Sequence, residues 1–335
     1  MSLTTVLIAL AAVAVSTGLL LIVVGFVWWL DRYDREPLHL VAAVFLWGAL
    51  VSPMVSGISV AALGRIVEGT VPAESLGMFG ISFFGPFVEE TIKAIGVLLV
   101  VLLTDKFDNP TDGVVYGTAV GLGFAVTENF FFALGAIAES SGTGDILILV
   151  GGRTLLTAGV HALSGAVFGG LLGYAVLSPR RAVRVGWSLA GLVLAVALHS
   201  AWNTALLYVG PFSPDGKLRG WLAVLPSLYV VYVIILTAFL SAEHRILKRE
   251  LAEEVDLMLA PAWVVDVIPY YSRRVRGNWW PSRTERTVIA RLLTRVAFRK
   301  HSLRRLPQDE ATIASLELVK LRQRVREILG PPESH

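Results

Sequence analysis

The chain has 335 residues, of which 55% are hydrophobic and only 16% are charged, and its mean hydropathy is +0.67. This composition excludes an ordinary soluble globular protein and indicates a polytopic membrane protein. Cysteine is absent, which excludes a disulfide framework, a thiol nucleophile and a cysteine zinc site.

Apolar runs long enough to cross a bilayer as helices, about 20 residues each, follow one another along the chain. The seven runs cover approximately residues 4–30, 38–63, 77–103, 113–138, 146–176, 186–209 and 220–242. The first has no basic segment before it and a longer apolar core than a signal peptide, so we interpret it as a retained helix. The expected fold is an all-α membrane bundle of about seven helices in residues 1–242.

The loops between these runs carry basic residues unevenly. Six Lys and Arg lie in the loops after the first, third and fifth runs, and three lie in the alternate loops. Eighteen more follow residue 242. Because short cytoplasmic loops carry the excess of Lys and Arg, we expect the N-terminus outside and the C-terminus in the cytoplasm.

Residues 243–335 form the second predicted region, which is small, basic, helical and cytoplasmic. Ser282 lies three residues before Glu285, a capping-box pattern that opens an amphipathic helix. A second amphipathic segment ends at Gly330 and two prolines, a common helix stop. Between residues 261 and 281, aromatic residues alternate with arginines. That mixture favours contact with anionic lipid headgroups, and a solvated basic linker is the alternative.

A few strongly polar residues lie inside the predicted spans at matching depths. Each lies about 12 to 15 residues from the start of its span, or roughly 18–22 Å at the rise of an α-helix. They are Glu89, Glu90, Glu128, His161 and His199. Since neighbouring spans run antiparallel, these side chains are expected near mid-membrane, where charged groups are costly and usually functional. The third to sixth spans are therefore predicted to build one site.

The helical phase of these residues supports the same prediction. Glu89 and Lys93 are four residues apart and share a helix face, as do His199 and Asn203. Small residues allow the spans to approach closely, because Gly-x-x-x-Gly patterns occur at residues 117–121 and 165–173.

This set of side chains suits the activation of a water molecule. Two imidazoles and a carboxylate are a familiar ligand set for catalytic zinc, with a fourth position left for water. We therefore predict Glu128, His161 and His199 as metal ligands and zinc as the cofactor. Glu89 or Glu90 can act as general base, and Lys93 or Asn203 can stabilise the oxyanion. The alternative is a water activated by a carboxylate without metal.

Each residue also has a purely structural interpretation. Glu89 and Lys93 can form an ion pair, and a single buried histidine is commonly satisfied by a neighbouring helix. Arg153 lies near the outer end of the fifth span, where we expect a snorkelling or lipid-facing anchor. The coincidence of depth across four spans favours a functional site.

At these residues the sequence resembles the PrsW family of intramembrane proteases, which shares a superfamily with the type II CAAX prenyl proteases. The segments EETIK at 89–93, FAVTE at 124–128 and HSAWN at 199–203 match Glu-Glu-x-x-Lys, Phe-x-x-x-Glu and His-x-x-x-Asn. DGVVYG at 112–117 and the isolated His161 also fit. The resemblance covers roughly residues 25–240 and is specific as a set.

The resemblance implies a mid-membrane site and proteolysis of membrane-anchored regulators, such as anti-sigma factors, in a bacterial cell membrane. The residues in the family's functional positions are Glu89, Glu90, Glu128, His161, His199 and Asn203. We therefore predict an intramembrane endopeptidase, of metallo- or glutamate type, that acts on single-span substrates. No nucleic-acid partner is expected.

Two alternatives remain open from the sequence. A CAAX-type protease would act on prenylated C-termini, but its first motif typically reads Glu-Glu-x-x-x-Arg, and a histidine commonly replaces Glu128. A proton- or ion-coupled transporter could use the same buried carboxylates and histidines.

Overall fold

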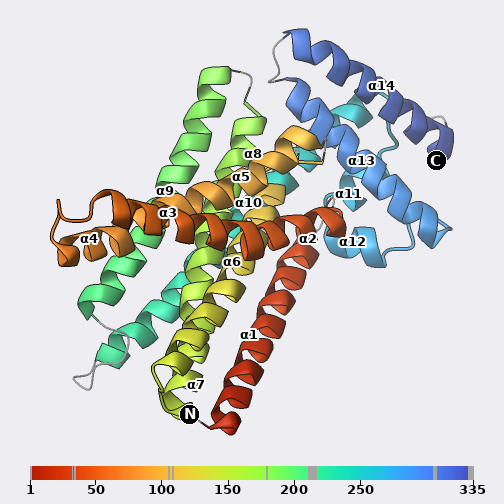
Figure 1. The fold of residues 1–335 in the computed structure, drawn as a ribbon. Coiled ribbons are helices and arrows are strands. Elements are labelled where there is room, and N and C mark those ends of the chain that lie inside the picture. The colour runs from red at the N-terminus through yellow and green to blue at the C-terminus, as the bar shows by residue number, and fades with distance from the viewer. Residues whose placement is uncertain are drawn as a thin grey trace.

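A computed structural model describes residues 2–31, 33, 35–104, 106–107, 109–178, 180–209, 217–304 and 308–330. Within these ranges the backbone forms helices joined by turns, and no strand occurs. Figure 1 shows a bundle of long helices with a smaller group of helices at its C-terminal end. The predicted all-α fold is confirmed.

Each predicted apolar run is helical over its whole length, and three of them contain a short π-helical stretch, labelled η. The elements of the bundle are α1 (Leu3–Leu30), α2 (Leu38–Leu46), η1 (Trp47–Val51), α3 (Ser52–Ile66), α4 (Ala73–Phe79), η2 (Gly80–Phe84), α5 (Gly85–Leu103), α6 (Pro110–Ala138), α7 (Thr143–Gly152), η3 (Arg153–Thr157), α8 (Ala158–Val176), α9 (Arg181–Val209) and α10 (Lys217–Asp256).

Within the described chain, six helical segments are long and apolar enough to cross a membrane. They are Leu3–Leu30, Leu38–Ile66, Pro110–Ala138, Thr143–Val176, Arg181–Leu207 and Pro226–Asp256. The remaining predicted run, from α4 through α5, differs from them because Glu89, Glu90 and Lys93 interrupt its apolar stretch. The prediction of about seven spans is thus confirmed for six by length and composition.

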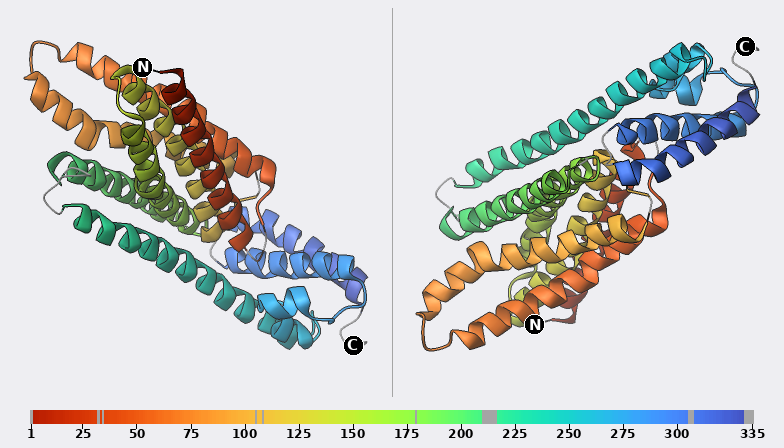
Figure 2. Two further views of the ribbon diagram at one scale, coloured as in Figure 1. Left: turned by 90° about the horizontal axis from the view of Figure 1, so that it is seen from below. Right: turned by 90° about the horizontal axis from the view of Figure 1, so that it is seen from above.

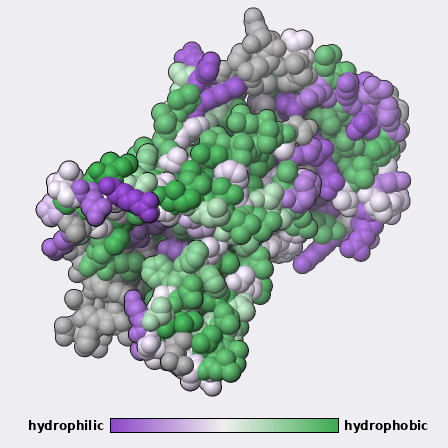
Figure 3. Space-filling view, viewed as in Figure 1, coloured by the Kyte–Doolittle hydropathy of each residue, from purple (hydrophilic) through white to green (hydrophobic). Residues whose placement is uncertain are grey.

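The surface of the bundle suits contact with lipid. Large apolar side chains are exposed along it, such as Ile22 on α1, Met54 on α3 and Leu102 on α5. Figure 3 shows apolar residues covering the bundle, whereas hydrophilic residues gather over the C-terminal helices. An exposed apolar surface of this extent is expected of a protein that is solvated by lipid rather than water.

The centre of the bundle is the pair of helices α6 and α8, whose backbones touch. A Cβ atom added to Gly117 would lie 1.9 Å from the carbonyl oxygen of Gly165, and one added to Gly121 would lie 2.1 Å from that of His161. The predicted close approach through Gly-x-x-x-Gly patterns is therefore present. It brings the backbone that carries His161 directly against α6, the helix that carries Glu128.

A capping box fixes where α6 begins. The side chain of Asn109 accepts hydrogen bonds from the backbone N–H groups of Thr111 and Asp112, and the Asp112 carboxylate accepts one from the N–H of Asn109. Pro110 occupies the first helical position, where its missing N–H has no cost. This start determines the depth at which Glu128 lies.

The two ends of the bundle are distinguished by contacts between distant segments. At one end, the hydroxyl groups of Thr5 and Thr143 are 3.3 Å apart. At the other end, the Tyr33 hydroxyl, which follows α1, donates to the carbonyl of Pro269 in the C-terminal region at 3.0 Å. Figure 2 shows the C-terminal helices together at that second end.

Four shorter helices form the C-terminal region: α11 (Trp263–Val267), α12 (Tyr271–Arg276), α13 (Arg283–Leu303) and α14 (Gln308–Leu329). Helix α10 continues across the predicted boundary at residue 242 and contributes Leu247 and Leu251 to their apolar core. Ser282 caps α13 by accepting from the N–H of Glu285, which is one half of the predicted capping box. The Glu285 carboxylate instead accepts from Nε1 of Trp280 at 2.6 Å. Gly330 has φ 73° after the end of α14, and the prolines after it lie outside the described residues.

Several aromatic and basic residues of segment 261–281 pack against other parts of the protein or against one another. Arg274 is buried, with its guanidinium 4.9 Å from the ring centroid of Tyr33. The rings of Trp263 and Trp279 are 5.1 Å apart. These contacts help fold the C-terminal region, and lipid contact by this segment stays a prediction.

Candidate active site

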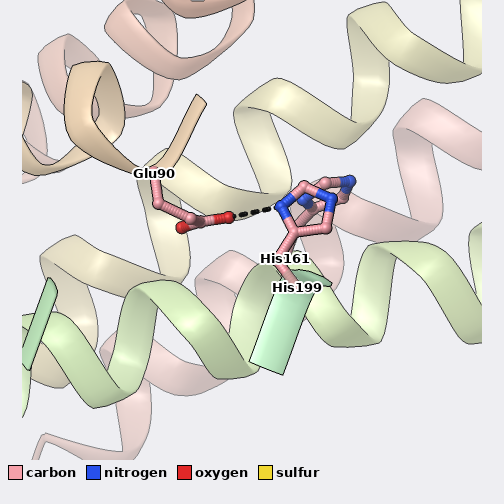
Figure 4. Close-up of side chains that lie close together, drawn as sticks. All are labelled: Glu90, His161 and His199. Atoms are coloured by element: carbon pink, nitrogen blue, oxygen red, sulfur yellow. Dashed lines mark hydrogen bonds and ion pairs between the residues drawn. The ribbon is translucent and has the colours of Figure 1, made fainter. Parts of the chain in front are cut away.

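Helices α5, α8 and α9 bring three buried side chains into one group. One ligand atom each from Glu90, His161 and His199 lies within 4.8 Å of the others, and the three residues are at most 2% exposed. Figure 4 shows the Glu90 carboxylate pointing at the two imidazole rings. The predicted convergence of distant spans at one place is therefore present.

Glu90 shares this place with a buried cation. The Nζ atom of Lys93 donates to Oε1 of Glu90 at 2.5 Å and to Nδ1 of His161 at 3.2 Å. Lys93 is 1% exposed and lies 4.8 Å from the ring centroid of Phe124. Lys93 therefore forms its ion pair with Glu90 and not with Glu89. This pairing compensates much of the free-energy cost of burying the two charges.

The carboxylate of Glu90 also orients His199. Nδ1 of His199 lies 2.8 Å from Oε1 of Glu90. A carboxylate can only accept, so the imidazole donates from Nδ1. Its other nitrogen, Nε2, lies 3.7 Å from Oε2 of Glu89.

Glu128 contacts His161 on the side of the ring opposite Lys93. Nε2 of His161 donates to Oε2 of Glu128 at 2.8 Å, while Lys93 contacts Nδ1. A carboxylate that accepts from one ring nitrogen fixes the tautomer of the imidazole and directs the other nitrogen into the site.

Arg153 also belongs to this group of residues. Its Nη2 lies 2.7 Å from Oε2 of Glu128, and its Nε donates to the side chain of Asn129 at 3.3 Å. The guanidinium stacks over Phe132, 3.5 Å from the ring centroid. The sequence-based expectation of a lipid-facing anchor is wrong, because the Arg153 side chain is only 10% exposed and turns inward to the partly buried carboxylate of Glu128. An arginine inside an apolar run was itself a signal of function.

Two π-helical stretches border the site. Arg153 begins η3, and Ile81 lies in η2, where its carbonyl accepts a hydrogen bond from Nδ2 of Asn203 at 3.0 Å. π-Helical turns inside α-helices are frequently found at functional sites. Asn203 therefore ties α9 to the segment that leads into α5.

A cavity of about 730 Å³ lies beside the buried group. Glu89, Glu128, Arg153 and Asn203 all line it, together with apolar side chains such as Leu206. Within the described lining, Glu90, His161 and His199 are absent, so they lie behind the cavity wall. Oε2 of Glu89 is buried and has no hydrogen-bond partner among the described residues.

The donor chemistry of the buried group fits a metal ion. A carboxylate and two imidazoles from three helices form a tripod of the kind that binds catalytic zinc. The structure groups Glu90, rather than the predicted Glu128, with the two histidines. Lys93 already contacts Glu90 and His161, so a metal and the ammonium compete for the same donors.

Comparison with known proteins identifies the family of the chain. The family model described as PrsW family intramembrane metalloprotease matches residues 36–240. A protein called Protease PrsW from Bacillus subtilis (strain 168) is 33% identical over 180 residues, which cover 52% of this chain and 73% of that protein. One of the same name from Geobacillus kaustophilus (strain HTA426) is 30% identical over 177 residues, covering 53% and 71%.

No solved structure matches the chain. The family match ends close to the point where the C-terminal region begins, and it includes every residue of the buried group. The chain therefore belongs to the PrsW family of intramembrane metalloproteases and is a multi-pass membrane protease.

Proposed function

We propose that this protein is an endopeptidase of the bacterial cell membrane that cleaves membrane-anchored, single-span protein substrates, of the type of anti-sigma-factor regulators, within the bilayer. One observation carries this proposal. The Glu89 carboxylate stands in a largely apolar cavity beside a buried carboxylate and two buried histidines. Membership in a protease family argues against the transporter alternative.

The walls of the cavity support a substrate that comes from the membrane. Leu63 of α3, Leu76 of α4 and Leu156 of η3 line it, as do several glycines, including Gly77 and Gly80. Apolar walls suit a hydrophobic peptide segment, and glycines leave room for its backbone. A transmembrane segment that partly unwinds would present its peptide bonds to Glu89.

We assign the role of general base to Glu89. Its side chain is 19% exposed and lines the cavity, whereas the Glu90 side chain is 2% exposed and bonded to Lys93 and His199. A base must reach the water that it deprotonates. Glu89 would take a proton from water and pass it to the leaving amine, and Glu90 would orient His199.

The residues that would hold a metal are Glu90, His161 and His199, with Glu128 orienting His161. Zinc, when bound there, supplies a Lewis acid that polarises a carbonyl and makes water more acidic. Arg153 lines the same cavity with a positive charge, and we assign to it the stabilisation of the developing oxyanion. Asn203 keeps η2 in place through the carbonyl of Ile81.

The proposed orientation has the N-terminus outside and the C-terminal region in the cytoplasm. The distribution of basic residues supports it, because the basic loops and the basic C-terminal region lie at one end of the bundle. The positive-inside rule predicts that this end lies in the cytoplasm. The bacterial relatives support a bacterial membrane.

The test uses the full chain reconstituted in lipid vesicles with a labelled single-span substrate. We expect one discrete fragment, and the Glu89→Gln variant should lower its rate of formation by about 10²–10⁴-fold, the usual loss with a general base. Glu139→Gln, at the exposed end of α6, removes a carboxylate of the same kind outside the cavity and should keep full activity.

Two results would overturn the proposal. Unchanged cleavage by Glu89→Gln would remove Glu89 as the base. Cleavage of a prenylated C-terminal peptide, with no cleavage of the single-span substrate, would favour the CAAX-type alternative.

A further inference from the structure

A second cavity lies between the bundle and the C-terminal region, and its lining is strongly basic. It has a volume of about 650 Å³. Of its twelve lining residues, seven are arginine or lysine and two are glutamate. This cavity is separate from the active site, since the two share no lining residue within the described chain.

The basic residues come from two parts of the chain. Arg35, which follows α1, and Lys106, which follows α5, are contributed by the bundle. Helix α13 contributes three arginines and α14 contributes a lysine and an arginine, namely Arg291, Arg295, Arg299, Lys320 and Arg324.

The helical spacing shows that these charges form faces rather than a random distribution. Arg291, Arg295 and Arg299 are successive i,i+4 neighbours on α13, and Lys320 and Arg324 are i,i+4 neighbours on α14. Like charges at this spacing repel and destabilise a helix. Arg299 is paired with Glu317, and an anion held between the two helices would lower the repulsion further.

The two carboxylates of the lining are already engaged. Glu36 accepts a hydrogen bond from the Tyr116 hydroxyl, and Glu317 forms an ion pair with Arg299. The lining still holds seven cationic side chains against these two carboxylates. The cavity keeps an excess of positive charge.

The cavity lies at the level where the apolar spans end. Trp28, two residues before the end of α1, lines it and donates from Nε1 to the carbonyl of Glu36 at 2.7 Å. The Arg35 guanidinium lies 5.3 Å from the centroid of the Trp28 ring. Tryptophan is enriched at the membrane–water interface, and arginine is enriched in the cytoplasmic loops next to it. Lipid headgroups supply phosphate groups at this level.

We propose that this cavity binds the phosphate-bearing headgroup of an anionic phospholipid and thereby fastens the C-terminal region to the bundle. Anionic lipids attract basic residues at the membrane surface, and guanidinium groups bind phosphate oxygens in pairs of hydrogen bonds. The volume is within the range of small-ligand sites. The inference is independent of the proposed proteolytic mechanism.

The test measures binding of short-chain phosphatidylglycerol to the purified full chain in neutral detergent. Short-chain phosphatidylcholine and inorganic phosphate are the comparison ligands. The Arg291→Gln/Lys320→Gln/Arg324→Gln variant removes three exposed charges of the cavity. The matched control is Arg276→Gln/Arg283→Gln/Arg326→Gln, which removes three exposed charges of the same region outside the cavity lining.

We expect the cavity variant to bind phosphatidylglycerol at least about tenfold more weakly than wild type, a loss of about 1.4 kcal/mol. The affinity of the control variant should stay within about twofold of wild type. Lys320→Gln alone should give a smaller loss of the same sign, which keeps the test valid if the triple variant misfolds. Glu89→Gln should bind the lipid normally even if the proposed base is wrong.

Equal losses in the cavity variant and the control would show a diffuse charge effect and overturn the site. Equal binding of phosphatidylcholine would overturn the requirement for an anionic headgroup. Inorganic phosphate that binds as tightly as the lipid would assign the cavity to a free anion and overturn the lipid assignment.

Discussion

Nδ1 of His199 lies 2.8 Å from Oε1 of Glu90, the same oxygen that accepts a hydrogen bond from Lys93. One buried carboxylate thus organises a histidine from α9 and a lysine from its own helix. Its neighbour in sequence, Glu89, faces the cavity instead. Two adjacent glutamates on α5 therefore have different surroundings and different expected roles.

The ion pair between Glu90 and Lys93 predicts a large effect on stability. Glu90→Gln would leave a lysine that is 1% exposed without its carboxylate, and breaking a buried pair costs about 3–5 kcal/mol. We expect a loss of this size in the free energy of unfolding, measured with denaturant in detergent micelles. The Glu90→Gln/Lys93→Met variant should recover most of the lost free energy of unfolding. A Glu90→Gln variant as stable as wild type would contradict the ion pair.

Arg153 is expected to affect catalysis. Arg153 lines the active-site cavity and forms an ion pair with Glu128, and loss of one oxyanion-stabilising group typically lowers kcat by about 10²–10³-fold. We expect Arg153→Gln to lower kcat by about this factor, measured with the single-span substrate. Arg65→Gln, an exposed arginine at the end of α3, is the control and should leave kcat unchanged. Loss of the same size in both variants would refute the assignment.

The metal assignment predicts a measurable stoichiometry. Purified protein should contain about one zinc ion per chain, held by three protein ligands as in catalytic zinc sites. His161→Ala/His199→Ala should lose it, whereas His39→Ala, which changes an exposed histidine, should not. Elemental analysis of the three proteins is the measurement, and equal zinc content in all three would exclude these ligands.

The contact between α6 and α8 predicts that one glycine of α6 tolerates no side chain while another does. A Cβ at Gly117 would meet the Gly165 carbonyl oxygen at 1.9 Å, whereas one at Gly135 would meet nothing within 4 Å. Gly117→Ala should destabilise the bundle by at least about 1–3 kcal/mol, the range for overpacking. Gly135→Ala, on the same helix, should be neutral or slightly stabilising. Equal unfolding temperatures of the two variants would contradict the close packing.

Much of the site could be predicted from the sequence because depth depends on local quantities. The apolar runs locate the helices, and the rise per residue places Glu128, His161 and His199 at similar depths. The tertiary structure brings Glu128 and His161 to 2.8 Å, as that depth requires. The N-cap at Ser282 could likewise be predicted from the sequence, because a cap involves only neighbouring residues.

The direction in which each side chain points was decided by tertiary structure. Arg153 turns inward at the π-helical stretch η3, and an inserted π turn changes the phase that a regular α-helix would give. The rotation of α5 about its axis decides which glutamate faces the cavity. In the structure this rotation turns Glu90 toward His199 on α9. Hydropathy and spacing therefore determined which helices form and how deep their polar residues lie. Packing between helices decided that Glu89 lines the cavity and that Glu90 lies beside the histidines. The reason is that the rotation of a helix about its axis is set by contacts between segments far apart in the chain.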